Sequence, residues 1–137
     1  MSSSNPVPDS AVPEATHLRN GGVSLVVTTD LFGAPTIAHW GAPLTDADIP
    51  GLLATATPAV MNSSLDVARS FSIAPGRAHG WSGTPAIEAT AADAVIDGFA
   101  LTRTVQTDAA SASFVLVDAR ATVEATFTFA LDEAGVL

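Results

Sequence analysis

The sequence contains no cysteine and no lysine, and these two absences exclude several classes of protein. Without cysteine, the chain can form neither disulfides nor thiolate metal sites. Five arginines stand against fourteen acidic residues, which gives a formal net charge of −9. Nucleic acids and anionic membranes both bind clustered Lys and Arg, so this charge argues against either as a partner. No run reaches the ~18 apolar residues that a membrane helix needs.

The N-terminal segment also lacks the features of a targeting signal. Residues 1–14, MSSSNPVPDSAVPE, contain neither a basic region nor an apolar stretch, so they do not resemble a secretory signal. A segment rich in Ser and Pro cannot bury enough apolar surface to offset the entropy of ordering it. We therefore expect a disordered leader over 1–14, a single domain over 15–137 and a cytoplasmic location.

Alternating apolar residues predict strands in the first third of the chain. THLRNGGVSLVVTTD predicts two strands around the turn Asn20-Gly21-Gly22, since these residues tolerate the positive φ of tight hairpins. TIAHW predicts a third strand, so residues 15–40 are expected to form a three-stranded meander.

The last third of the chain is also typical of strands. We expect one in AVIDGFALTRTVQTD, with a bulge at Gly98, and another in SASFVLVDA. The core row of SASFVLVDA is either Phe114 with Leu116 or Val115 with Val117. ATVEATFTFALD has the clearest alternation in the chain, with apolar residues on one face and Thr or Glu on the other.

The middle of the chain predicts one short helix followed by irregular structure. Thr45 and Asp48 have the spacing of a capping pair, which indicates a helix near residues 46–56. The residues after it are rich in Gly, Pro, Ser and Asn. Such a long irregular segment in a compact domain favours a functional loop or short irregular strands.

Together these elements predict an all-β fold, an antiparallel β-sandwich with one short helix. Alternation on one face of the strands implies two sheets that pack on each other. The closing LDEAGVL has a hairpin signal and then begins another strand. We therefore expect a sandwich that is incomplete at its C-terminal end, and a chain that is marginally stable or self-associating when isolated.

No catalytic or metal-binding motif is visible in the sequence. The three histidines have no ligand-like spacing, and no Gly-x-Ser-x-Gly is present, so we expect no metal, no cofactor and no catalytic residue in this chain. His39 and Trp40 end a predicted strand, so their side chains should point to opposite faces. We expect one of them to fill the core and the other to lie at its rim.

The irregular segment carries the candidate binding residues. Asn62, Asp66 and Trp81 combine an amide, a carboxylate and an indole. This combination suits sugar recognition, because the ring stacks on C–H faces while the polar groups bind hydroxyls. The alternative is that Trp81 simply anchors its loop on the sandwich.

The order and spacing of several segments resemble the N-terminal region of glycoside hydrolase family 36 α-galactosidases. These segments are HLRNGGVSLVVTT, PTIAHWGAPL, LLATATPAVMNSSLDVARSFSIAPGRAHGWSGTPAIEA and ATVEATFTFALDEAGVL, which span nearly all of the chain from His17 onward. The most specific are the strand ending His39-Trp40-Gly41, the segment around Trp81 and the closing LDEAGVL.

This resemblance implies an N-terminal β-supersandwich domain that supports a following catalytic (β/α)₈ barrel. The parent enzyme would hydrolyse terminal α-galactosides such as melibiose or raffinose with retention. The barrel would supply the two carboxyl groups, so this chain should be inactive alone. The resemblance further implies a possible homo-oligomer, in which Asp66 and Trp81 approach the galactoside of a neighbouring subunit. The alternatives are a free-standing carbohydrate-binding β-sandwich and a nonfunctional piece of a split reading frame.

Overall fold

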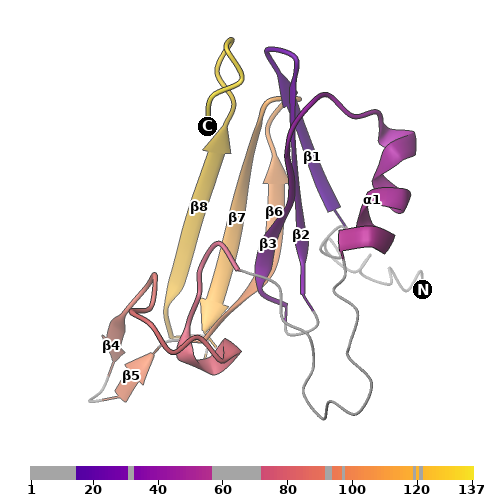
Figure 1. Ribbon diagram of the computed structural model, residues 1–137. Helices are drawn as coiled ribbons and strands as arrows, with labels where there is room; N and C mark the ends of the chain where they lie inside the picture. The colour runs from indigo at the N-terminus through magenta and orange to yellow at the C-terminus, as the bar shows by residue number, and fades with distance from the viewer. Residues whose placement is uncertain are drawn as a thin grey trace, which may run out of the picture.

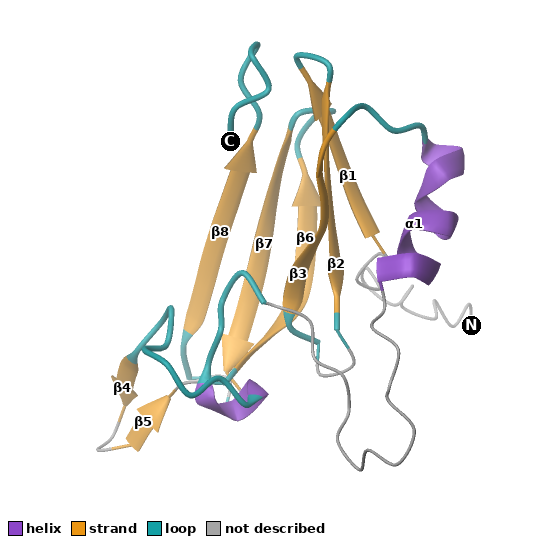
Figure 2. Ribbon diagram, viewed as in Figure 1, coloured by secondary structure: helices purple, strands orange, loops and turns teal. Residues whose placement is uncertain are grey.

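The computed structural model describes residues 15–30, 33–56, 72–91, 94–96, 98–118, 120 and 122–137. Two three-stranded antiparallel sheets dominate these residues (Figure 1, Figure 2). A two-stranded hairpin, of β4 (Ala89–Ala91) and β5 (Ala94–Ile96), lies at one end of the molecule. The expected leader over 1–14 lies outside the described residues.

The first sheet, here called the N-terminal sheet, has the strand order β1-β2-β3. Its strands are β1 (Ala15–Asn20), β2 (Val23–Thr29) and β3 (Pro35–Gly41), so the predicted meander is confirmed. Gly21 and Gly22 form the first turn with φ of 55° and 73°, a region that glycine enters without strain. The register of β3 on β2 shifts between Val26 and Val27, as at a β-bulge.

The second sheet, here called the C-terminal sheet, has the strand order β6-β7-β8. Its strands are β6 (Phe99–Gln106), β7 (Ser111–Asp118) and β8 (Glu124–Ala130). The bulge expected at Gly98 is wrong, because the register instead shifts between Leu101 and Arg103. Gly98 precedes β6, where a Cβ would lie 2.7 Å from the Cβ of Ala78.

A short helical segment follows β3, as predicted. It consists of the 3₁₀ turn η1 (Asp46–Asp48) and the helix α1 (Ile49–Ala56). The carboxylate of Asp48 accepts hydrogen bonds from the backbone N–H and the hydroxyl of Thr45, at 2.7 and 2.8 Å. A second 3₁₀ turn, η2 (Arg77–His79), lies in the long connection to β4.

Both sheets contribute to one hydrophobic core. Leu18 and Leu25 from the N-terminal sheet join Phe114 and Leu116 from the C-terminal sheet, and each of these side chains is fully buried. The core row of β7 is therefore Phe114 with Leu116, although Val115 on the other face is also buried. The tilted rings of Phe114 and Phe129 have centroids 5.5 Å apart, which suits an aromatic pair.

Hydrogen bonds also join the two sheets. The backbone N–H of Arg19 donates to the carbonyl of Ala109, and that of Leu101 donates to Gly33 at 2.8 Å. At the tip of the first hairpin, the side-chain amide of Asn20 donates to the carbonyl of Leu131 at 2.9 Å. The structure is thus mostly β, antiparallel and with one short α-helix among the described residues.

Candidate functional site

Three polar side chains, on the N-terminal sheet and in the segment after β3, are linked in a row by hydrogen bonds, as in a Ser-His-Asp catalytic triad. The ring of His17 lies between the carboxylate of Asp46, 2.9 Å from Nδ1, and the hydroxyl of Ser24, 3.0 Å from Nε2. His17 is in β1 and Ser24 is in β2, while Asp46 begins the 3₁₀ turn. Sequence reasoning missed this trio because it required a Gly-x-Ser-x-Gly turn for any reactive serine.

The burial of Ser24 does not suit a nucleophile. Its exposed fraction is 0 %, and its Oγ already accepts a hydrogen bond from the backbone N–H of Leu44 at 2.8 Å. An Nδ1–H tautomer of His17 would donate to Asp46 and accept from the Ser24 hydroxyl, so every polar group of the trio would have a partner. The trio therefore fastens residues 42–48 onto the outer face of the N-terminal sheet.

The charge of Asp46 is stabilised by the same arrangement. The hydrogen bond from His17 lowers the pKa of this carboxyl, and the nearby positive charge of Arg19 lowers it further. The Arg19 guanidinium lies 3.6 Å from the Asp46 carboxylate. The Asp46 side chain is 74 % exposed, so solvent screens these interactions.

A second ionised carboxylate, that of Asp118, organises the turn between β7 and β8. Its oxygens accept hydrogen bonds from the backbone N–H groups of Arg120, Thr122 and Val123, at 2.9, 2.7 and 2.7 Å. Burial favours the neutral acid, but the donors outweigh it and the pKa of Asp118 is lowered. This arrangement fixes a turn and leaves few lone pairs for a ligand.

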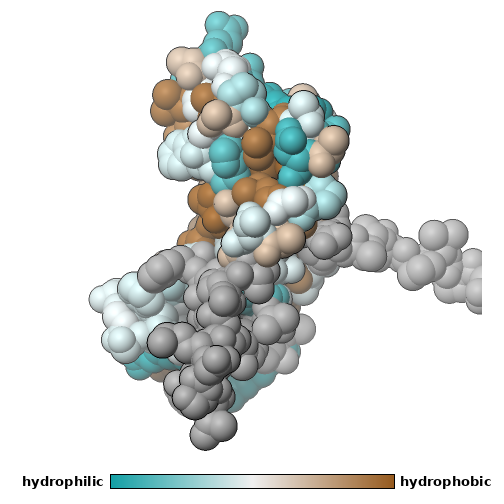
Figure 3. All heavy atoms as spheres, turned by 45° about the vertical axis from the view of Figure 1, so that its right-hand side comes forward, coloured by the Kyte–Doolittle hydropathy of each residue, from teal (hydrophilic) through white to brown (hydrophobic). Residues whose placement is uncertain are grey.

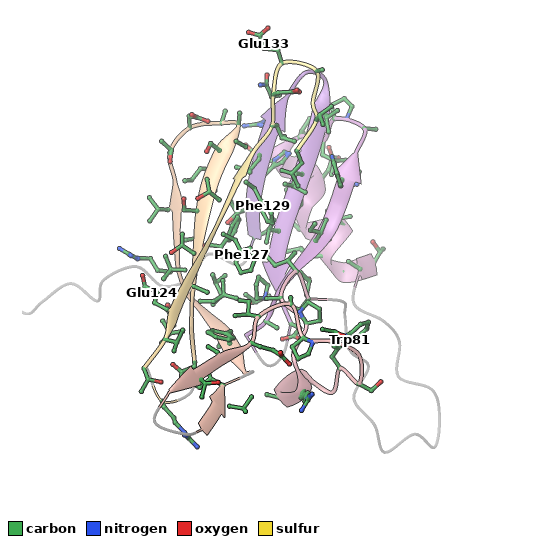
Figure 4. All side chains as sticks on the ribbon, turned by 90° about the vertical axis from the view of Figure 1, so that its left-hand side faces the viewer. Trp81, Glu124, Phe127, Phe129 and Glu133 are labelled. Atoms are coloured by element: carbon green, nitrogen blue, oxygen red, sulfur yellow. The ribbon has the colours of Figure 1, made fainter. Side chains whose placement is uncertain are left out.

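Of the predicted binding residues, the structure describes only Trp81. Asn62 and Asp66 lie outside the described residues. The Trp81 side chain is 38 % exposed, and its indole N–H donates to the carbonyl of Thr84 at 2.9 Å. A Cβ on Gly83 would lie 2.8–2.9 Å from atoms of the ring, so one side of the indole packs closely on the Gly83 backbone. The ring is therefore held by its own loop (Figure 4).

His39 and Trp40 point to opposite faces of β3. Trp40 pairs with Leu25, and residues that are directly opposite on neighbouring strands share a face, so Trp40 lies on the core-facing side. His39 pairs with Val26 on the other side, and its Nε2 lies 2.9 Å from the carbonyl oxygen of Ala42. The expectation that one of them fills the core is wrong, because Trp40 is 54 % exposed and His39 is half-buried.

Trp40 is one of two apolar side chains exposed on the core-facing side of β3. The other is Ile37, which pairs with the buried Val27 and is 39 % exposed. Both are on an edge strand, where the C-terminal sheet does not cover them fully. On the face drawn in Figure 3, hydrophobic residues are interspersed with hydrophilic ones.

The described part of the chain has neither a metal-binding cluster nor a membrane-spanning helix. No group of three or more His, Asp or Glu side chains there is placed to hold a metal ion. None of the helices described is long and apolar enough to span a membrane.

Comparison with known proteins adds no relative to this picture. No protein-family model, curated protein or solved structure gives a significant match to the chain. The site must therefore be interpreted from its own residues.

Proposed function

We propose that the chain is the non-catalytic N-terminal part of an α-galactosidase of the glycoside hydrolase family 36 type. In this proposal the two sheets belong to a β-supersandwich domain that supports a catalytic (β/α)₈ barrel and oligomer assembly. The observation that carries it is the pair of antiparallel sheets built on one core. That is the coarse architecture the resemblance implies.

The barrel would supply the chemistry of the proposed enzyme. A retaining glycosidase needs a nucleophile and an acid/base carboxyl about 5 Å apart across the scissile bond. Asp46 and Asp118 are both engaged in structural hydrogen bonds, so neither is offered as such a group. We therefore expect the chain alone to leave α-galactosides intact.

We place the barrel contact at the exposed apolar side chains of β3. Ile37 and Trp40 face the core side of their sheet and yet remain substantially exposed. Large apolar side chains in this position favour a further layer of protein, because burying them removes apolar area from water. Trp40 is the larger of the two and would contribute most, as buried tryptophans often do at interfaces.

The experiment combines the chain with a separately purified barrel of a family 36 α-galactosidase that lacks its own N-terminal domain. Calorimetry should detect binding, and Trp40→Ala should weaken it while the matched Trp81→Ala does not. The chain alone should not hydrolyse p-nitrophenyl α-galactoside. Turnover by the chain alone, or failure of the wild-type chain to bind the barrel, would contradict the proposal.

A free-standing carbohydrate-binding module is the second candidate, and Trp81 favours it. Its ring is immobilised by Gly83 and by the hydrogen bond to Thr84, and a fixed, partly exposed indole suits stacking on a sugar. Titration with galactose or raffinose should then change tryptophan fluorescence saturably, and Trp81→Ala should abolish the change while Trp40→Ala preserves it. Absence of saturable binding in the wild-type chain would exclude this second candidate.

A further inference from the structure

We propose that Asn20 is a modification site, at which the backbone nitrogen of Gly21 attacks the side chain and converts the asparagine to aspartate or isoaspartate. We further propose that residues 132–136, here called the C-terminal turn, protect this site while the two sheets are in contact. The inference goes beyond the proposed function, because it concerns the tip of the first hairpin rather than the β3 surface. Asn20 ends β1, and Gly21 and Gly22 form the turn to β2.

The reacting groups are already neighbours in the folded chain. The backbone N–H of Gly21 donates to the side-chain oxygen of Asn20 at 3.0 Å. Gly21 is exposed, so hydroxide from the solvent can reach this N–H, and glycine has no side chain to hinder closure of a ring. The other two asparagines of the sequence are followed by different residues. Asn5 precedes a proline, which has no N–H, and Asn62 precedes a serine.

The reaction needs only base and water from the solvent. The Gly21 nitrogen loses its proton and forms a bond to the side-chain carbonyl carbon of Asn20. The bond from that carbon to the amide nitrogen breaks, and the nitrogen takes up a proton and leaves as ammonia. Water then opens the cyclic imide at either carbonyl, which gives aspartate or isoaspartate. No group is oxidised or reduced.

Two hydrogen bonds hold the Asn20 carboxamide in an unreactive orientation. Its nitrogen donates to the carbonyl of Leu131 at 2.9 Å, and its oxygen accepts from Gly21. A donor to a carbonyl oxygen prefers the plane of the carbonyl group, whereas a nucleophile must approach the carbon from above that plane. The carboxamide therefore has to rotate before Gly21 can attack, and this rotation breaks the bond to Leu131.

The C-terminal turn also packs directly on the tip of the hairpin. A Cβ built on Gly21 would lie 2.5 Å from the carbonyl oxygen of Glu133 and from the backbone nitrogen of Gly135. A Cβ on Gly135 would in turn overlap the side chain of Val23. Such close backbone packing restrains the tip, so the reactive orientation requires the two sheets to separate locally at this point.

The product of the reaction cannot restore the contact. A carboxylate at position 20 has no N–H to donate, and it would face the carbonyl oxygen of Leu131, which only accepts. Each conversion also adds a negative charge to a chain whose formal charge is −9. Converted molecules therefore keep this end of the two sheets open, and Asn20 records irreversibly how often the sheets have separated there.

The first experiment compares the folded chain with the chain unfolded in urea, both in mildly alkaline buffer. Peptide mass spectrometry follows the replacement of the Asn20 amino group by hydroxyl, and ion exchange follows the added charge. A reaction through a locally opened state tracks the population of that state, so the folded chain should react about fivefold more slowly or less. Asn20→Gln should stop the reaction, because its longer side chain closes a larger and less favourable ring.

Two matched variants test the protection by the C-terminal turn, since each removes one negative charge from it. The Asp132 carboxylate closes the turn by accepting hydrogen bonds from the N–H groups of Ala134 and Val136, at 2.9 and 2.8 Å. Asp132→Ala should therefore loosen the turn and speed the reaction of Asn20 toward its rate in urea. The Glu133 side chain is exposed at the tip of the turn (Figure 4), so Glu133→Ala should react like the wild type.

Circular dichroism verifies that the variants fold, and hydrogen exchange gives a second measurement. The N–H of Gly135 donates to the carbonyl of Asp132 at 3.0 Å, so its exchange rate reports opening of the C-terminal turn. Asn20→Asp, which copies one product, should raise that rate. Trp40→Ala should leave both the exchange rate and the reaction of Asn20 unchanged, so these tests fail separately from that of the barrel contact.

Three outcomes would overturn the proposal. The first is a folded chain that reacts as fast as the chain in urea, which would mean that the fold does not protect Asn20. The second is no reaction at Asn20 in either condition. The third is a folded Asp132→Ala variant whose reaction is no faster than that of Glu133→Ala.

Discussion

The central strand of the N-terminal sheet and the edge strand of the C-terminal sheet have different burial patterns. In β2, four consecutive residues from Ser24 to Val27 are buried, whereas β8 alternates between exposed and half-buried residues. Residues 42–48 are fastened over the outer face of the first sheet, and the outer face of β8 is exposed. A strand in which exposed residues alternate strictly with more buried ones therefore has one face open to solvent. A strand with consecutive buried residues is covered on both faces.

The largest expected effect comes from the core that both sheets share. Phe114→Ala should lower the free energy of unfolding by about 3–5 kcal/mol and Leu25→Ala by about 2–5 kcal/mol, through lost burial and the cavities left behind. Urea unfolding, followed by circular dichroism and by tryptophan fluorescence, should show one common transition for each variant. Separate transitions would mean that the two sheets unfold independently and that the shared core does not couple them.

Two serine substitutions compare the covered outer face of the N-terminal sheet with the open outer face of the C-terminal sheet, through their effects on the free energy of unfolding. Ser24→Ala leaves the partly buried N–H of Leu44 without its acceptor, so it should cost about 1–3 kcal/mol. Ser113→Ala on β7 removes only an exposed hydrogen bond to Thr128 and should cost less than about 0.5 kcal/mol. Equal losses in urea unfolding would show that the two outer faces are not different in the way described.

The sequence predicted the elements whose residue pattern follows directly from their local structure, such as alternating burial in a strand or glycines in a turn. The alternation of β8 and the glycines between β1 and β2 are local signals, and both elements were predicted closely. The exposure of Trp40 was not predictable, because it depends on how far the second sheet extends over β3. The His17–Ser24–Asp46 trio was missed because His17 and Asp46 are 29 residues apart and meet only after the loop folds back.

A pH dependence distinguishes the turn of the C-terminal sheet. The pKa of Asp118 is lowered in the folded chain, because the backbone donors around it outweigh the effect of burial. Its contribution to stability is therefore present above the ordinary carboxyl value of 3.8 and is lost as the pH falls through the folded pKa. Asp118→Asn should destabilise the chain at neutral pH and flatten the acid side of its stability profile, as measured by urea unfolding from neutral pH to about pH 3. A profile as steep as that of the wild type would assign the acid sensitivity to other groups.

The smallest effect is expected at Asp46, and it separates two explanations for the covered face of the N-terminal sheet. The Asp46 carboxylate is largely exposed, so its hydrogen bond to His17 and its ion pair with Arg19 are screened, whereas the Ser24–Leu44 hydrogen bond is partly buried. Asp46→Asn should therefore lower the melting temperature slightly at low salt, and the difference should vanish at high salt. A loss as large as that of Ser24→Ala, at either salt concentration, would mean that the contacts of Asp46 rather than the buried serine hold residues 42–48 in place. The outer face would then be covered only while Asp46 stays ionised, and β2 would lose its second buried row as the pH falls.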